Sequence, residues 1–233
     1  MNIALFGYGK MGKTIERIAL SRGHAIVAKI DINTKTYDLS KADVAIDFSI
    51  PTEAYNNINI CFNNNIPIVS GTTGWLDKYN DAVAICKSKN GAFIYASNYS
   101  LGVNLFFELN IKLAKMMRKF DVYNVDIEEI HHTQKLDAPS GTAITLAEGI
   151  IEQSDRVNWS LGVTNNKKTI PIVSKRIDNV PGTHTIAYYS DVDTIEIVHT
   201  AKNRDGFALG AIIAAEWLRD KNGVFTMKDV LGI

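Results

Sequence analysis

The chain has 233 residues, of which 46% are hydrophobic and 21% charged, values typical of a folded globular protein with a sizeable core. Its 25 basic residues balance its 25 acidic ones, which argues against a nucleic-acid-binding protein that depends on a global positive field. No apolar run approaches the length of a membrane span, and no basic leader with a small-residue cleavage site precedes the first apolar strand. We therefore expect a cytoplasmic protein that binds neither membranes nor nucleic acid.

The first hundred residues alternate between apolar runs and helix-compatible segments. The apolar runs are Ile3–Phe6, Ala25–Ile30, Val44–Phe48, Pro67–Val69 and Ala92–Ala96. Helical patterns occupy Met11–Ser21, Thr52–Asn64 and Leu76–Lys87, whereas the short polar stretch 33–41 is expected to be a loop. This alternation predicts an α/β fold whose N-terminal domain is a Rossmann-like parallel sheet built from right-handed βαβ units.

The pattern changes after residue 102. A long helix is expected over Val103–Phe120, and a shorter helix over Ala143–Ile151. Strand-like runs occupy Tyr123–Ile130, Thr169–Ile177, Thr183–Tyr189 and Thr194–His199. This order predicts a C-terminal α+β domain over 103–203, with an open mixed sheet whose uncovered face serves in oligomerisation. A last helical pattern, Phe207–Arg219, is expected to return to the first domain, which then comprises 1–102 and 204–233.

Two cysteines, Cys61 and Cys86, fall in helix-like segments without the spacing of metal ligands. We expect both to be buried thiols in a reducing compartment, and we expect no metal site.

A glycine-rich turn follows the first predicted strand and opens a helix. It reads Gly7-Tyr8-Gly9-Lys10-Met11-Gly12, the G-x-G-x-x-G pattern of dinucleotide-binding domains. Asp31 ends the second strand, where an acidic side chain accepts hydrogen bonds from a ribose hydroxyl and repels a 2′-phosphate. No Arg follows it, and Lys35 is the nearest basic residue. The motif predicts NADH as the preferred cofactor, with NADPH also possible.

Three further loops follow the carboxyl ends of predicted strands, where ligands of open α/β sheets bind. The alternative for each loop taken alone is an ordinary turn whose residues bind no ligand. The residues expected to line the cofactor crevice there are Ser49, Gly71, Thr72, Thr73, Ala96, Ser97, Asn98 and Tyr99.

The segment 129–143 places titratable groups between a strand end and a helix start. It contains His131, His132 and Lys135, and then the turn Ser140-Gly141-Thr142. Imidazolium and ammonium groups neutralise carboxylates and supply a proton near neutral pH, and the free N–H groups of a helix start hold an anion. The combination suits a small dicarboxylate substrate that receives a proton. A solvated strand end, a surface lysine and a simple helix cap are the alternatives for these groups taken singly.

The order His-His-x-x-Lys-x-Asp-Ala-Pro-Ser-Gly-Thr over 131–142 resembles the signature of 4-hydroxy-tetrahydrodipicolinate (dihydrodipicolinate) reductases. The segments 47–51, 71–74, 98–104, 181–184 and 199–211 also resemble that family, so the likeness covers nearly the whole chain. It implies an NAD(P)H-dependent reductase of lysine biosynthesis, in the form of a homotetramer. The chain departs from the family in lacking an Arg after Asp31 and in two shortened loops.

The resemblance also implies roles for individual residues. His131 is expected to be a proton donor and acceptor and Lys135 a proton donor. His132, Ser140, Gly141 and Thr142 are expected to bind a dihydropyridine-type cyclic dicarboxylate, formed when the 4-hydroxy compound loses water. The alternatives are another amino-acid-pathway dehydrogenase, such as an aspartate dehydrogenase, and a dinucleotide-sensing protein that has lost its chemistry.

Overall fold

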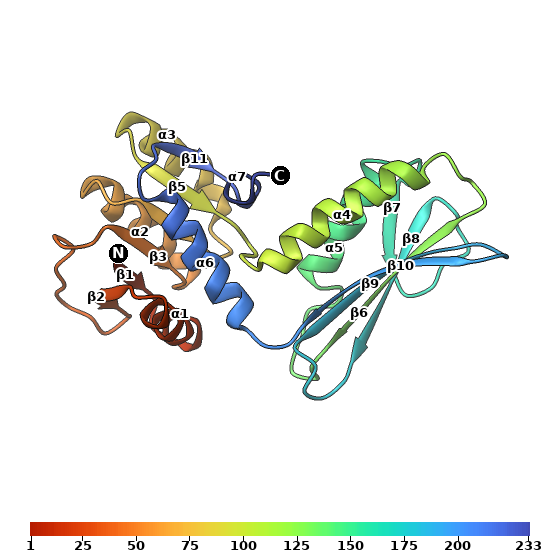
Figure 1. The fold of residues 1–233 in the computed structure, drawn as a ribbon, viewed down its shortest axis with the longest axis horizontal. Coiled ribbons are helices and arrows are strands. Elements are labelled where there is room, and N and C mark those ends of the chain that lie inside the picture. The colour runs from red at the N-terminus through yellow and green to blue at the C-terminus, as the bar shows by residue number, and fades with distance from the viewer. The chain divides into compact units, whose positions relative to one another are not determined.

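A computed structural model describes residues 1–233, which form two compact units (Figure 1). The first unit comprises Met1–Asn104 and Arg204–Ile233, and the second comprises Leu105–Asn203. A parallel sheet in the first unit and a mixed sheet in the second confirm the predicted fold class.

The first unit is built on a six-stranded parallel sheet. Its strands are β1 (Asn2–Phe6), β2 (Ala25–Ile30), β3 (Val44–Asp47), β4 (Ile68–Ser70), β5 (Ala92–Tyr95) and β11 (Gly223–Phe225), in the order β11-β5-β4-β3-β1-β2. Its helices are α1 (Lys10–Ser21), α2 (Pro51–Asn63), α3 (Tyr79–Ser88), α6 (Asp205–Leu218) and α7 (Met227–Leu231), with a 3₁₀ turn η1 (Leu76–Lys78).

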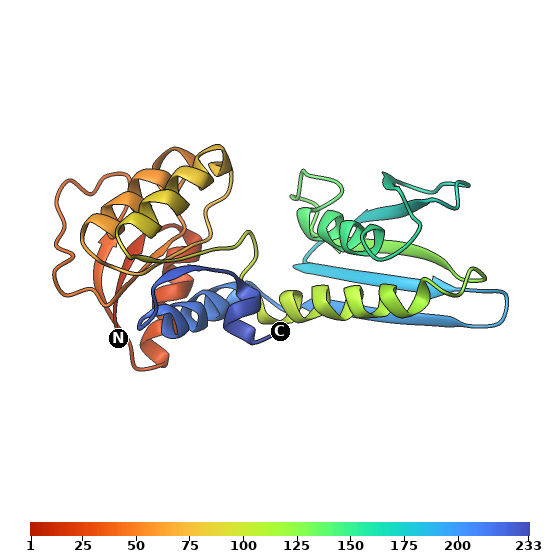
Figure 2. The same cartoon turned by 90° about the horizontal axis from the view of Figure 1, so that it is seen from above.

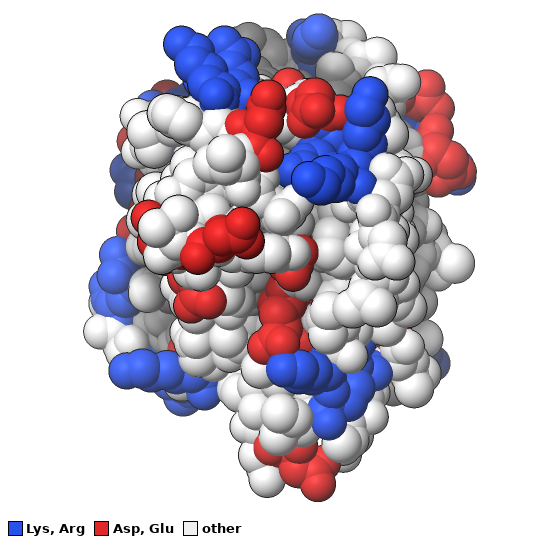
Figure 3. Space-filling view, turned by 90° about the vertical axis from the view of Figure 1, so that its right-hand side faces the viewer, with Lys and Arg blue, Asp and Glu red and all other residues white.

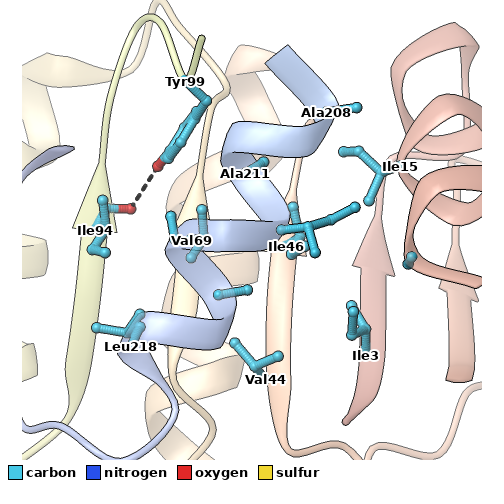
Figure 4. Close-up of a cluster of buried hydrophobic side chains, with 14 of the residues drawn as sticks. Ile3, Ile15, Val44, Ile46, Val69, Ile94, Tyr99, Ala208, Ala211 and Leu218 are labelled. Carbon is cyan, nitrogen blue, oxygen red and sulfur yellow. Dashed lines mark hydrogen bonds between the residues drawn. The ribbon is translucent and has the colours of Figure 1, made fainter. Parts of the chain in front are cut away.

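Helices cover both faces of this sheet, α1 and α6 on one side and α2 and α3 on the other (Figure 2). Alternate residues of β1 show the division, since Ile3 and Leu5 pack toward α6 while Ala4 and Phe6 pack toward α2. Ala208, Ala211 and Leu218 of α6 lie in the first of these two cores (Figure 4). The helix α6 therefore belongs to the core of the first unit.

The second unit has the strands β6 (Asn124–His131), β7 (Asn158–Leu161), β8 (Thr169–Arg176), β9 (Gly182–Tyr189) and β10 (Thr194–Ala201), in the order β10-β9-β6-β8-β7. Its helices are α4 (Leu101–Met117), which begins in the first unit, and α5 (Gly141–Ile151). The strands β7 and β11 were not predicted, because four and three residues are too few for a strand pattern to be recognised.

One face of the second sheet packs against α4 and α5. Val125 and Ile127 of β6 lie in this core with Leu113 of α4 and Leu146 of α5. No helix of the unit covers the other face, where Val198 of β10 is 54% exposed. The sheet is therefore open on one side.

None of the helices combines the length and the hydrophobicity that spanning a membrane requires. On the face of the molecule in Figure 3, acidic and basic side chains are interspersed, and neither sign forms one continuous field. This distribution accords with the balanced charge of the sequence.

Candidate active site

The glycine-rich turn of the first unit fits an anion between β1 and α1. Gly7 has a φ of +87°, and a Cβ atom there would lie 2.1 Å from the carbonyl oxygen of Phe48. A Cβ on Gly12 would lie 2.2 Å from the carbonyl oxygen of Gly7, so neither position admits a side chain. Nothing lies within 4 Å of a Cβ built on Gly9. No side chain caps α1, so the N–H groups of Lys10, Met11 and Gly12 are available to a pyrophosphate.

A cavity of about 320 Å³ lies beside this turn and extends along the end of β2. Gly7, Asp31, Tyr37, Ser49 and Glu53 are among its lining residues, and no Lys or Arg is. The Asp31 carboxylate accepts a hydrogen bond from the Ile32 N–H at 2.9 Å and stays exposed. Size, position and an exposed carboxylate fit the ribose end of a dinucleotide. Lys35, the basic residue considered from sequence, does not line the cavity.

A buried carboxylate, Asp47, holds the loops at the carboxyl ends of β3 and β4. Its Oδ1 accepts hydrogen bonds from Ser49 (2.6 Å) and Asn57 (3.0 Å), and its Oδ2 from Ser70 (2.9 Å) and Thr72 (2.7 Å). Burial raises the pKa of Asp47, and these four hydrogen bonds oppose that rise. Asp47 therefore fixes the backbone at Ser49 and Thr72, two of the predicted cofactor residues.

Several predicted cofactor residues have side chains that already have partners. The Tyr8 hydroxyl donates to Glu16. The Tyr99 hydroxyl donates inside the core to the carbonyl oxygen of Ser70 (2.9 Å) and to that of Ile94 (3.2 Å), the second bond being drawn in Figure 4. Because the side chain of Tyr99 is engaged in the core, Tyr99 can contact a ligand only through its backbone atoms. The remaining predicted residues of these loops, Gly71, Thr73, Ala96, Ser97 and Asn98, are exposed or half-buried.

In the second unit, polar residues replace apolar ones at the end of the covered face of β6. Val125, Ile127, Glu129 and His131 all point inward, as the alternation of side chains along a strand requires. The strands pair Glu129 with Ser174 of β8 and with His184 of β9. These residues form one polar row across the sheet. The strand ends at His131, so His132 lies beyond it, at the start of the loop.

Glu129 is fully buried and lies at the centre of this row. Its Oε1 accepts hydrogen bonds from the Ser174 hydroxyl (2.7 Å), the Ser140 N–H (3.1 Å) and Nη2 of Arg176 (3.3 Å). Its Oε2 lies 2.9 Å from Nδ1 of His131. Burial by itself raises the pKa of Glu129, but the close ion-pair contact with His131 and the hydrogen bonds from Ser140 and Ser174 outweigh it and hold the pKa well below its usual value. Since an ionised carboxylate only accepts, Nδ1 of His131 is the ring nitrogen that faces Glu129 as a donor, and Nε2 is left to other partners.

Ser140 is the N-cap of α5. Its hydroxyl accepts a hydrogen bond from the Ala143 N–H (3.2 Å) and lies 3.1 Å from Nε2 of His184. Burial, followed by the charge of His131, lowers the pKa of His184 to about 4, so this imidazole is neutral. The cap leaves the N–H groups of Gly141 and Thr142 available to an anion.

Lys135 lies on the loop between β6 and α5. Its Nζ is 2.7 Å from both carboxylate oxygens of Asp137, and this pairing lowers the pKa of Asp137. Arg176 anchors the same loop, because its Nη2 donates to the carbonyl oxygen of Asp137 (2.6 Å) and its Nε to that of Lys135 (3.2 Å).

The predicted site omitted four residues that organise it, Asp47, Glu129, Arg176 and His184. Glu129 carried a usable signal, since the alternation of β6 placed it on the same face as His131. The partners Arg176 and His184 come from other strands, and only the register of the sheet brings them to Glu129.

Comparison with known proteins identifies the family. The model of the dihydrodipicolinate reductase N-terminus matches residues 1–99, and that of the dihydrodipicolinate reductase C-terminus matches residues 102–231. The chain belongs to the dihydrodipicolinate reductase family. Membership makes it a reductase of lysine biosynthesis with a dinucleotide-binding domain for NAD(P)H. The predicted family and enzyme class are confirmed, and the two alternative functions are set aside.

Two relatives in this family cover the chain from end to end. A 4-hydroxy-tetrahydrodipicolinate reductase from Christiangramia forsetii is 61% identical over 99% of this chain and 98% of its own. One from Archaeoglobus fulgidus is 33% identical over 99% of this chain and all of its own. A dipicolinate-bound dihydrodipicolinate reductase from a Paenisporosarcina species has a similar fold, with a TM-score of 0.78 at 24% identity, covering 97% of each chain.

Proposed function

We propose that this chain reduces the dihydrodipicolinate-type cyclic dicarboxylate that forms when 4-hydroxy-tetrahydrodipicolinate loses water. The product is tetrahydrodipicolinate. When bound, NAD(P)H supplies the hydride that adds to one carbon of the substrate. The protein supplies the proton that the neighbouring carbon takes up, so that the two additions balance. The names of the relatives at 61% and 33% identity support this substrate.

We assign proton transfer to His131 and Lys135. The contact of Nδ1 with Glu129 leaves Nε2 of His131 as the nitrogen that can exchange a proton with a substrate. The Lys135 ammonium is paired with Asp137, whose side chain is 60% exposed. Because Asp137 is so exposed, a substrate carboxylate can take its place as the partner of the Lys135 ammonium. The ammonium then lies against the substrate.

Substrate carboxylates bind, in this proposal, at the start of α5 and at His132. The free N–H groups of Gly141 and Thr142 supply fixed donors, and Ser140 holds the turn in place. One observation carries the proposal: the buried Glu129 carboxylate joins His131 to the Ser140 N–H, so a proton carrier and an anion site are parts of one structure.

For the cofactor, we propose NADH in preference to NADPH. The residues that would hold the dinucleotide are Gly7, Tyr8, Gly9, Lys10, Met11, Gly12, Asp31, Ser49, Gly71, Thr72, Thr73, Ala96, Ser97, Asn98 and Tyr99. Two carboxylates, Asp31 and Glu53, line the cavity beside the glycine turn, and neither Lys nor Arg does. An added 2′-phosphate would meet negative charge there without a cation to neutralise it.

We further propose a homotetramer in the cytoplasm. The open face of the second sheet, which includes the exposed Val198, is the surface that a second copy would cover. Cys61 and Cys86 are free, buried thiols whose pKa burial raises, as suits a reducing compartment. Size-exclusion chromatography with light scattering tests the assembly.

Steady-state oxidation of NADH with enzymatically generated substrate tests the activity. We expect Lys135→Ala to lower kcat by roughly 10²- to 10⁴-fold, the range of a lost general acid, with the Kd for NADH unchanged. Lys167→Ala removes an exposed lysine of the same unit and serves as the control. Turnover of Lys135→Ala within threefold of wild type would remove this lysine from the mechanism.

A further inference from the structure

The buried carboxylate of Glu129 has partners on both of its oxygen atoms, and these partners lead to both proposed proton carriers. On the Oε2 side, Nδ1 of His131 lies at 2.9 Å. On the Oε1 side, the Ser140 N–H, the Ser174 hydroxyl and Nη2 of Arg176 all donate. A buried carboxylate without partners is strongly destabilising, so the partners of Glu129 are tightly constrained.

Arg176 extends this network to the loop that carries Lys135. Its guanidinium donates to three carbonyl oxygens, those of Lys135 (3.2 Å), Asp137 (2.6 Å) and Lys175 (2.8 Å), and Nη2 also reaches Glu129. Only the planar fork of an arginine presents donors in so many directions at once. The backbone on either side of Leu136 is thereby tied to the sheet.

We propose that Glu129 and Arg176 are positioning residues that together orient the two proton carriers, Glu129 acting on His131 directly and Arg176 acting on Lys135 through its loop. The inference rests on the proposed function, because it presupposes the roles of His131 and Lys135. Its physical basis is pre-organisation: a proton carrier held at one angle needs no reordering when the substrate arrives.

The same cluster has the donor set of a metal site, since Glu129, His131 and His184 offer ligand atoms within 4.8 Å of one another. The guanidinium of Arg176, 3.3 Å from Oε1, already supplies a positive charge to this carboxylate. The guanidinium of Arg176 therefore supplies the positive charge that a bound metal ion would otherwise bring to Glu129. We infer a hydrogen-bonded scaffold rather than a metal centre.

The first test is Glu129→Gln, which keeps the shape of the side chain but removes its charge. We expect kcat to fall by about 10- to 100-fold, as for other residues that orient a reacting group. The KM should change less than threefold and the Kd for NADH not at all. Glu148→Gln removes the same charge from an exposed position on α5 and should leave kcat unchanged. Full activity of Glu129→Gln would overturn the inference.

The second test separates positioning from simple structural support by double-mutant cycles. If Glu129 acts through His131, Glu129→Gln should lower kcat less than threefold further in the His131→Ala background. If Arg176 acts through Lys135, Arg176→Lys should likewise add little to Lys135→Ala. Additive losses in both cycles would mean that the residues only stabilise the fold, and would overturn the inference.

Should Glu129→Gln fail to fold, the double-mutant cycle of Arg176→Lys with Lys135→Ala still tests the inference. Arg176→Lys keeps a positive charge near the Glu129 carboxylate. Dialysis against EDTA is a further arm: loss of wild-type activity and its recovery with Zn²⁺ would make the cluster a metal site and overturn the scaffold. The proposed function fails in a different way, through an inactive wild type or unaffected His131→Ala and Lys135→Ala variants.

Discussion

A Cβ atom added to Gly182 would lie 3.0 Å from Nε2 of His131, the nitrogen that we propose to exchange a proton with the substrate. Gly182 is the first residue of β9 and is buried. The absence of a side chain there leaves room for the imidazole beside the strand. The backbone at Gly182 does not have a positive φ, so the space, and not the conformation, is what calls for glycine.

Gly182→Ala should therefore displace the His131 ring by a few tenths of an ångström. We expect kcat to fall by about tenfold, because small misplacements of a reacting group are costly. Gly206→Ala is the control, since its added Cβ meets its nearest atom, Oγ of Ser100, at an ordinary 3.6 Å. Steady-state kinetics of the two variants measure this effect. An unchanged kcat in Gly182→Ala would show that the His131 ring tolerates an added Cβ atom and would contradict the prediction.

Thr142→Val tests the anion site at the start of α5. The substitution removes a hydroxyl but keeps the shape of the side chain and the N–H group. We expect a KM raised by about three- to tenfold with a smaller change in kcat, because a carboxylate is held in the ground and transition states alike. Thr145→Val makes the same change at an exposed position of the same helix. Equal KM values for the two variants would leave Ser140-Gly141-Thr142 as a helix cap alone.

Asp31→Ser tests the choice of cofactor. The wild type should show a modestly higher kcat/KM with NADH than with NADPH, because Asp31 repels a 2′-phosphate and accepts ribose hydroxyls. The variant should narrow or reverse this ratio. Asp38→Ser removes a carboxylate from the same loop that does not line the cavity, and should leave the ratio as it is. A wild type that prefers NADPH would require Lys10, Lys13 or Lys35 to reach the phosphate.

His184 makes the stability of the enzyme depend on pH. Its pKa is lowered from 6.5 to about 4, so the folded state binds a proton less readily than the unfolded chain. The stabilisation by the neutral ring is complete above pH 6.5 and is lost as the pH falls toward 4. Between pH 7 and pH 5 the loss amounts to about 2 kcal/mol.

Urea denaturation at pH 7 and pH 5 measures this dependence. His184→Gln lacks the titrating ring, so its free energy of unfolding should fall about 2 kcal/mol less over that interval. The depressed pKa of Glu129 takes effect only below its ordinary value of 4.5, outside the interval. An identical slope in wild type and variant would contradict the assignment to His184.

The sequence allowed the parallel sheet and the family to be predicted, because these depend on local patterns. The apolar runs at Ile3–Phe6 and Ala92–Ala96 needed no partner to be recognised. The alternation of a strand likewise puts Glu129 on the same face as His131 without knowledge of any partner. The partnership of Glu129 with Arg176, 47 residues later, depends on the pairing of β6 with β8, and no local pattern specifies that register.

The short strand β11 was not predicted for a different physical reason. β11 has three residues and begins at Gly223, whose φ is +130°. Val224 and Phe225 favour an extended chain, but so short a run becomes a strand only because β5 offers it a hydrogen-bonding edge. The side chain of Tyr99 likewise gave no sequence signal that it would be buried, since Asn98-Tyr99-Ser100 is polar on both sides.

The order in which the chain is synthesised has a consequence for how the first unit can fold. Its sheet and one of its two cores are completed by α6 and β11, which belong to the last thirty residues. A ribosome makes the whole of the second unit before these residues emerge. Until then the inner sides of Ile3, Val44 and Val69 lack the helix that covers them. A nascent or prematurely terminated chain thus exposes an apolar surface in its amino-terminal part. A stop codon shortly after residue 203 should therefore yield aggregates rather than a folded nucleotide-binding fragment.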